Sequence, residues 1–176
     1  MDARSLLREY VQEARGFFEG TIQDVTPEQA HWSPPGQANP VGANIAHVVF
    51  SEDMVINGLL QGGAPLAASS WAGKTGVSEP PPDGAASAVW GEWAHKVKVD
   101  LPALRQYAQA VHAATDKYLA SLSDGALERS LDLSAMGLGQ QTVRWMLNAV
   151  LIGNVNMHCG EIACLKGLQG AKGYPF

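Results

Sequence analysis

Apolar side chains recur every three or four residues in five stretches of this chain, and this helical spacing is the feature that most limits how it can fold. The stretches cover residues 6–18, 41–60, 86–98, 104–122 and 142–168. Connections rich in glycine and proline separate them, at 62–85 and again at 123–141. Helices of this kind bury their apolar faces against one another. The pattern predicts an all-α protein, an antiparallel four-helix bundle with long crossover loops.

Short polar and proline signals mark the helix ends. Thr26, Pro27 and Gln29 predict one short helical turn from Pro27 to His31. Asp100 and Pro102 interrupt the apolar pattern, so we expect two helices to meet there. No β-hairpin signal is found, and residues 123–141 are therefore predicted to be a connection without strands.

The size and charge of the chain limit the classes of function. Its 176 residues, 46% of them hydrophobic, suit a single domain spanning 1–176. The formal net charge of −5 argues against a nucleic-acid partner. No secretory signal or membrane-spanning stretch is recognised, so we expect a soluble, cytoplasmic protein without a membrane partner. Cys159 and Cys164 lie five residues apart on one predicted helix and should stay reduced and unpaired.

Polar side chains interrupt the apolar face of the last helix, and they form the strongest local anomaly in the sequence. Asn154, His158 and Glu161 fall on the same predicted core-facing stripe as three leucines, a valine and an isoleucine: Leu147, Val150, Leu151, Ile162 and Leu165. Burying these groups unpaired would cost several kcal/mol. We therefore expect them to bond one another, to meet His47 across the molecule, or to hold an ion.

Both a hydrogen-bonded core network and a metal site agree with this pattern. A first-row metal suits imidazole nitrogen combined with oxygen donors. A carboxylate-bridged di-iron site is disfavoured, because only Glu52 and Glu161 are suitably placed. The remaining histidines and tryptophans have simpler predictions, and so do both cysteines. We expect His31, His95 and His112 at the surface, Trp90, Trp93 and Trp145 in the core, and Cys159 and Cys164 as small buried groups.

Three stretches in this order resemble the DinB/YfiT-like superfamily of metal-binding four-helix proteins: 26–29, 44–52 and 158–163. The ending from 165 to 176 resembles a bacterial subgroup of that superfamily. The resemblance implies a divalent metal, nickel or zinc, held by one histidine of the second helix and two of the last. His47 and His158 match two of these places, whereas Asn154 stands at the third. The metal ligands expected here are therefore His47, His158 and Asn154.

The resemblance also implies a function. Characterised relatives include thiol-dependent transferases and isomerases, so we expect an S-transferase or related hydrolase that uses a low-molecular-weight thiol on a small molecule. Glu161 is the expected catalytic residue, either orienting a histidine or moving a proton. A homodimer is also implied. The alternative is a metal-free helical module that binds a ligand or a partner and catalyses nothing, because an amide is a poorer metal donor than imidazole.

Overall fold

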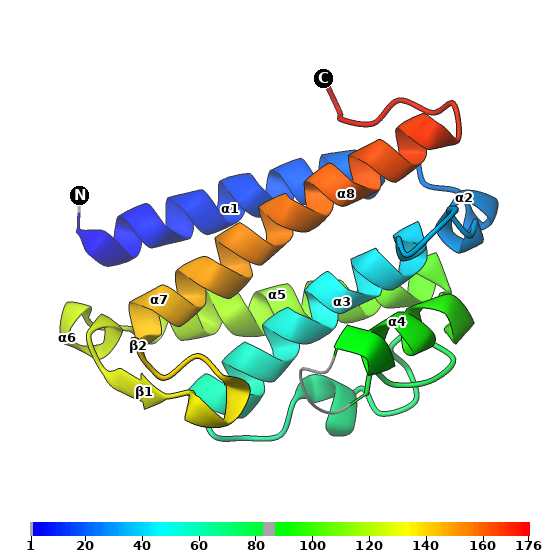
Figure 1. Cartoon of the computed structure of the whole chain (residues 1–176). Helices are drawn as coiled ribbons and strands as arrows, with labels where there is room; N and C mark the ends of the chain where they lie inside the picture. The colour runs from blue at the N-terminus through cyan, green and yellow to red at the C-terminus, as the bar shows by residue number, and fades with distance from the viewer. Residues whose placement is uncertain (1, 83–86) are drawn as a thin grey trace.

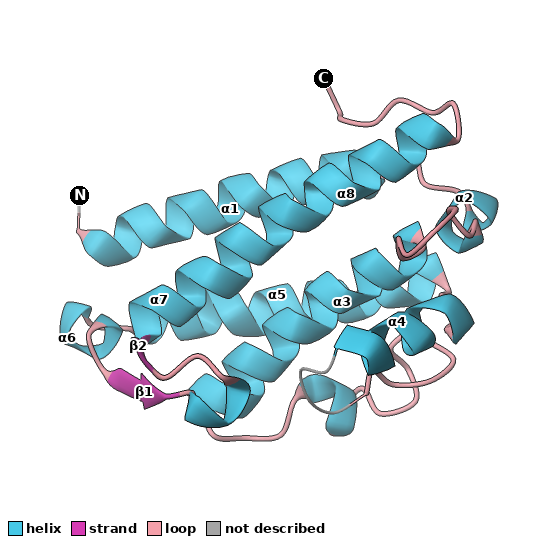
Figure 2. Ribbon diagram, viewed as in Figure 1, coloured by secondary structure: helices cyan, strands magenta, loops and turns pink. Residues whose placement is uncertain are grey.

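Helices dominate the computed structural model, which describes residues 2–82 and 87–176 (Figures 1 and 2). This confirms an all-α fold. The longest elements are α1 (Ala3–Ile22), α3 (Val41–Asp53) with η1 (Met54–Leu60), α5 (Leu101–Ser121), and α7 (Val143–Asn148) followed by η4 (Ala149–Asn154) and α8 (Val155–Leu168). Helix α3 packs against both α5 and α8, while α1 packs against α8 and α5. In the described part of the chain, no helix is long and apolar enough to cross a membrane.

Shorter elements cover the ends of these helices. They are α2 (Pro27–His31), the 3₁₀ turn η2 (Leu66–Ala68), α4 (Ser87–Lys96), α6 (Asp124–Leu127) and the 3₁₀ turn η3 (Ser134–Met136). The Thr26 side chain and Gln29 form a reciprocal capping box, and Asp100 caps α5 at Ala103, as predicted. The predicted start of a helix at Ala86 lies outside the described residues.

The prediction that residues 123–141 lack strands was wrong. β1 (Ser130–Asp132) pairs antiparallel with β2 (Gln140–Thr142), with Leu131 opposite Gln141. These strands carry few apolar residues, so they lack the alternation that marks a half-buried strand in a sequence. Their backbone hydrogen bonds, rather than side-chain patterning, hold the ribbon together.

Two of the long helical segments contain π-helix, which is rare in proteins and often occurs near functional sites. η1 continues α3 after Asp53, and η4 lies between α7 and α8. Because a π-turn holds more residues than an α-turn, residues on its two sides are rotated relative to a continuous α-helix. This rotation affects which side chains of the last helix face the core.

Adjacent carboxylates at the end of α3 are buried among the helices. Asp53 is fully buried and accepts hydrogen bonds from the Tyr107 hydroxyl at 2.5 Å and from the backbone N–H groups of Leu66 and Ala67, both at 2.9 Å. Glu52 accepts from Arg15 and from the Thr115 hydroxyl, each at 2.6 Å. These bonds connect α3 to α1, α5 and the loop after η1.

Candidate functional site

Helix α3 packs against α8 (Figure 1), and His47 of α3 meets His158 of α8 at this contact. Their ring centroids are 4.7 Å apart, with an angle of 64° between the ring planes. Both side chains are partly buried. His47 is half-buried, and 17% of the His158 side chain is exposed. The structure thus brings together the two histidines that the sequence analysis singled out.

A small pocket opens beside the two histidines. Its volume is about 110 Å³, and α4 closes one side of it. Trp90 lies edge-on to the His47 ring, at 4.7 Å between centroids and 86° between planes. The lining residues are Asn39, Ala43, Asn44, His47, Trp90, Trp93, Ala94 and His158. An apolar wall of two tryptophans therefore shields the imidazoles from water.

Ser51 is a neighbour that the sequence analysis missed. Its hydroxyl lies 3.4 Å from Nε2 of His47, one turn further along α3. The only signal in the sequence was its i,i+4 spacing from His47, which places the two side chains on one helix face. Ser51 gives the His47 ring a hydrogen-bonding neighbour from its own helix.

Asn154 lies at the end of η4, one helical turn before His158. A hydrogen bond from Asn154 acts to raise the pKa of His47. Such an interaction favours the protonated ring and places the Asn154 amide beside the imidazole. The amide nitrogen Nδ2 is buried without a hydrogen-bond partner. The structure therefore places both the Asn154 amide and the His158 ring next to His47.

Glu161 lies on the outer side of this group. Its Oε2 is 2.6 Å from Nδ1 of His158, so the carboxylate accepts the Nδ1 proton and leaves Nε2 with a free electron pair. The Glu161 side chain is 56% exposed, which corrects the expectation that it would face the core. Of the two roles predicted for Glu161, this geometry suits the orienting role.

Burial determines the charge of His47. Desolvation and, to a smaller extent, the nearby His158 lower the pKa of His47 to about 4, although Asn154 and Glu161 partly oppose these effects. His47 is therefore a neutral imidazole at pH 7, which is the form that binds metals.

A divalent cation such as zinc requires several donor atoms from the protein. Within residues 2–82 and 87–176, no group of three or more His, Cys, Asp or Glu side chains comes close enough to hold a metal. Two imidazole nitrogens and one amide oxygen are nevertheless three donors that zinc or nickel accepts, with positions left for water or substrate. The unpartnered atom of Asn154 is its Nδ2 donor, which a cation does not satisfy, so only the amide oxygen is available as a ligand.

Several other predictions required correction. His31 is not an ordinary surface residue, because its Nε2 accepts a hydrogen bond from the Val99 backbone at 2.9 Å. His112 has only 20% of its side chain exposed and lies 3.8 Å from Glu52. Trp145 is 38% exposed instead of lying in the core, and Cys164 is exposed. His95 is exposed, Trp93 and Cys159 are buried and both cysteines are free, as predicted.

The metal-free protein should lose stability as the pH falls from 6.5 to about 4. In the unfolded chain His47 has the ordinary pKa of 6.5, whereas in the folded protein the pKa of His47 is about 4. Unfolding therefore takes up protons in this window, and stability decreases by about 3 kcal/mol from His47 alone. Urea unfolding of chelator-treated protein between pH 5 and 6.5 measures this slope.

A His47→Gln variant should have a flatter slope, whereas exposed His95→Gln should match the wild type. Equal slopes in all three proteins would contradict the prediction.

The fold and the site together define a class: helical proteins in which facing histidines from two packed helices, with a third polar donor, line a small pocket. Comparison with known families identifies the particular one. Residues 10–162 match the DinB superfamily, and the chain belongs to that superfamily.

A solved structure supports the same fold. The chain is similar to a protein from Enterococcus faecalis, described as a conserved protein of locus, with a TM-score of 0.78 and 25% sequence identity. The alignment covers 96% of this chain and 97% of that chain. No curated protein matches the sequence.

Proposed function

We propose that this protein is a divalent-metal-dependent enzyme built on an antiparallel four-helix bundle, most consistent with an S-transferase or related hydrolase that uses a low-molecular-weight thiol. The observation that carries the proposal is the meeting of His47 and His158, whose ring centroids are 4.7 Å apart, with the Asn154 side chain beside His47. The neutral state of His47 supports it further. Free Cys159 and Cys164 agree with a reducing, cytoplasmic location.

Each residue has a defined task in this proposal. His47, His158 and Asn154 would hold nickel or zinc. When bound, such a cation lowers the pKa of a coordinated thiol, so that the nucleophilic thiolate is present at neutral pH. Glu161 holds the proton of His158 Nδ1 and so keeps Nε2 free. Trp90 packs against the edge of His47 and excludes water from that side of the pocket.

Removing His158 tests the proposal directly. His158→Ala should lower the affinity for zinc and nickel at least 100-fold, since one of two nitrogen donors is lost. Isothermal titration of untagged, chelator-treated protein measures the affinity, and elemental analysis measures metal retained after purification. His95→Ala is the matched control, because His95 is exposed on α4 and lies outside the pocket lining. Unchanged affinity in His158→Ala would overturn the proposed site.

Replacing Glu161 should have a smaller effect. Glu161→Gln removes the acceptor charge that holds His158 Nδ1, and we expect metal affinity to fall roughly 10- to 100-fold. Exposed Glu92→Gln on α4 serves as the control, since its carboxylate pairs only loosely with Lys96 at 3.8 Å. The same titrations apply. An affinity loss as large as that of His158→Ala would assign Glu161 a direct ligand role and contradict the orienting role.

A second candidate is favoured by one specific observation. Asn154 supplies an amide where a third imidazole would bind metal more strongly, and its Nδ2 lacks a partner in the buried site. This suits a metal-free module in which the polar pocket binds a small ligand without catalysis. Absence of zinc and nickel binding in the wild-type protein would favour this candidate. Asn154→His should then create binding that the natural chain does not have.

The partners in the proposal are a small-molecule substrate and a second copy of the chain. The pocket of about 110 Å³ is smaller than the roughly 300–1,000 Å³ of drug-sized ligand pockets, so it would hold only part of a small-molecule substrate. The homodimer stays a prediction based on family resemblance, to be measured by sedimentation velocity.

A further inference from the structure

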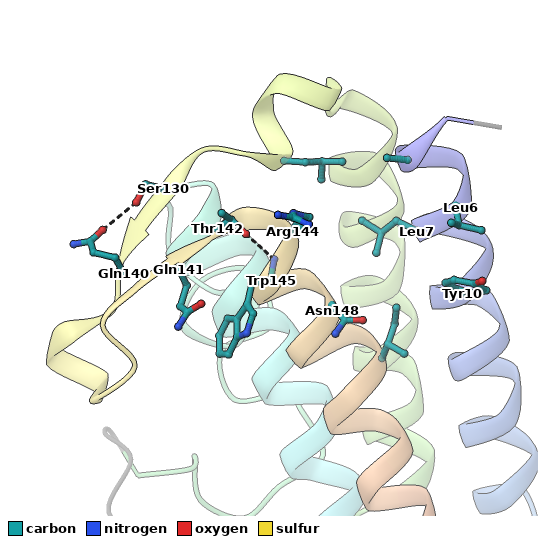
Figure 3. Close-up of a pocket in the computed structure, with 13 residues that line it drawn as sticks. Leu6, Leu7, Tyr10, Ser130, Gln140, Gln141, Thr142, Arg144, Trp145 and Asn148 are labelled. Carbon is teal, nitrogen blue, oxygen red and sulfur yellow. Dashed lines mark hydrogen bonds between the residues drawn. The ribbon is translucent and has the colours of Figure 1, made fainter.

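A second, larger pocket lies at the opposite end of the molecule from α4, where α1, α6, the β-ribbon and α7 meet (Figures 1 and 3). Its volume is about 690 Å³, within the range of pockets that hold small organic ligands. None of its lining residues belongs to the histidine pocket. It is therefore a separate site, and the proposed metal chemistry does not account for it.

The wall of this pocket exposes large apolar side chains. Leu6 is 40% exposed, Tyr10 48% and Trp145 38%, and all three line the same pocket together with Leu7 (Figure 3). Large apolar groups gathered in one concavity are unusual on a protein surface and mark a binding site more often than a chance grouping. The prediction that Trp145 packs in the core was wrong because its ring lies in this wall.

Most polar groups of the wall are already hydrogen-bonded within the protein. The Thr142 hydroxyl accepts from the Trp145 backbone at 3.1 Å, and the Ser130 hydroxyl donates to Gln140 at 3.0 Å (Figure 3). Gln141 donates to the Leu138 carbonyl at 2.9 Å. A ligand with many polar groups would find few free partners here, so the pocket suits a mostly apolar molecule.

Arg144 distinguishes one end of the pocket. It is the only residue charged at pH 7 among those that line the pocket, and no carboxylate is present in this lining within the described chain. Its Nε lies 3.1 Å from Glu128 at the rim, where the two side chains are 64% and 61% exposed. An ion pair this exposed is worth little, so an anionic group can replace Glu128 at small cost.

We propose that this pocket binds an apolar molecule with a single anionic group, such as a medium-chain carboxylic acid. Leu6, Leu7, Tyr10 and Trp145 contact the apolar body, and Arg144 pairs with the carboxylate. This function is independent of the metal site, since binding here requires neither His47 nor His158.

The proposal is tested by titrating the protein with octanoate and, separately, with 1-octanol. NMR of the amide and indole N–H signals detects binding. Octanoate should shift the Trp145 indole signal. Leu6→Ser and Trp145→Ala should each weaken octanoate binding roughly tenfold. Arg144→Gln should weaken octanoate binding about three- to tenfold and leave 1-octanol binding unchanged. Leu168→Ser is the control, because Leu168 is 63% exposed and lies outside the pocket.

Each contrary outcome overturns a defined part of the proposal. No octanoate binding at millimolar concentration, or equal binding by Leu6→Ser, Trp145→Ala and wild type, overturns the site. Equal octanoate binding by Arg144→Gln and wild type overturns the anionic specificity. If Leu6→Ser instead separates a dimer in sedimentation velocity, this face is a contact between two copies and the proposed ligand is wrong. Far-UV circular dichroism of both apolar variants establishes that they are folded, and the two substitutions lie on different helices.

Discussion

Asp53→Ala should destabilise the folded protein by about 4 kcal/mol, a factor of nearly a thousand in the folding equilibrium. The carboxylate of Asp53 is fully buried and accepts hydrogen bonds from Tyr107, Leu66, Ala67 and Asn57. Alanine would leave two backbone N–H groups and a buried hydroxyl without partners, and each unsatisfied group costs about 1–3 kcal/mol. Urea unfolding monitored by circular dichroism measures the loss.

Tyr107→Phe is the matched control for this prediction. It removes one donor, leaves the Asp53 bonds to the loop intact and should cost only about 1–1.5 kcal/mol. Desolvation and the hydrogen bond to Asp53 both raise the pKa of Tyr107, so the hydroxyl stays protonated and donating through the neutral range. A loss below 1 kcal/mol for Asp53→Ala would show that the loop after η1 does not depend on this carboxylate.

Arg15→Met should destabilise the protein by about 3–4 kcal/mol at pH 7. The Arg15 guanidinium bonds Glu52, whose side chain is 3% exposed, and Asp116, whose side chain is 51% exposed, both at 2.6 Å. Removing the guanidinium leaves the Glu52 carboxylate charged and buried, with only the Thr115 hydroxyl as a close partner and the His112 ring at 3.8 Å. Chemical unfolding at pH 7 measures this effect.

The two carboxylates that share Arg15 supply the control. Asp116→Ala removes the exposed partner and should cost less than about 1 kcal/mol. Adding Glu52→Gln to Arg15→Met removes the uncompensated charge and should recover a large part of the lost stability, a coupling that a double-mutant cycle measures. Equal losses for Arg15→Met and Asp116→Ala would mean that burial does not determine the strength of this network.

The helices were predictable because their signals are local. Apolar residues at helical spacing, the capping box at Thr26 and Gln29, and the cap at Asp100 act within one or two turns. The candidate ligands were also found from the sequence, since Asn154 and His158 are four residues apart and interrupt an apolar face. His47 was identified as a candidate ligand from its place on the second predicted helix and from the family resemblance.

Errors on the last helix have a common physical cause. The sequence pattern placed Trp145 at core spacing and Glu161 on the core-facing stripe of one continuous α-helix from 142 to 168. In the structure, η4 intervenes between these two residues and changes the rotation per residue. Trp145 therefore lines the large pocket, while Glu161 reaches the outer side of His158. A π-helix of six residues leaves no recognisable periodicity in a sequence.

Buried charges were beyond the reach of sequence patterning for another reason. Lys166 is 2% exposed, and its ammonium donates to the Thr21 carbonyl at 2.7 Å and to Asp24 at 2.6 Å. Glu52 similarly depends on Arg15 of α1 and Thr115 of α5. A charged side chain is buried only where partners from distant segments meet it, and no local signal identifies those partners.

The amino-acid sequence alone determined the helical class, most helix ends and the candidate ligands of the proposed metal site, because periodicity, capping and donor chemistry are properties of neighbouring residues. Packing of α3 on α8 was needed to place His47 against His158. The large pocket likewise exists only where α1, the β-ribbon and α7 meet. Such features depend on side chains far apart in the chain, whose contacts arise from the folded arrangement as a whole.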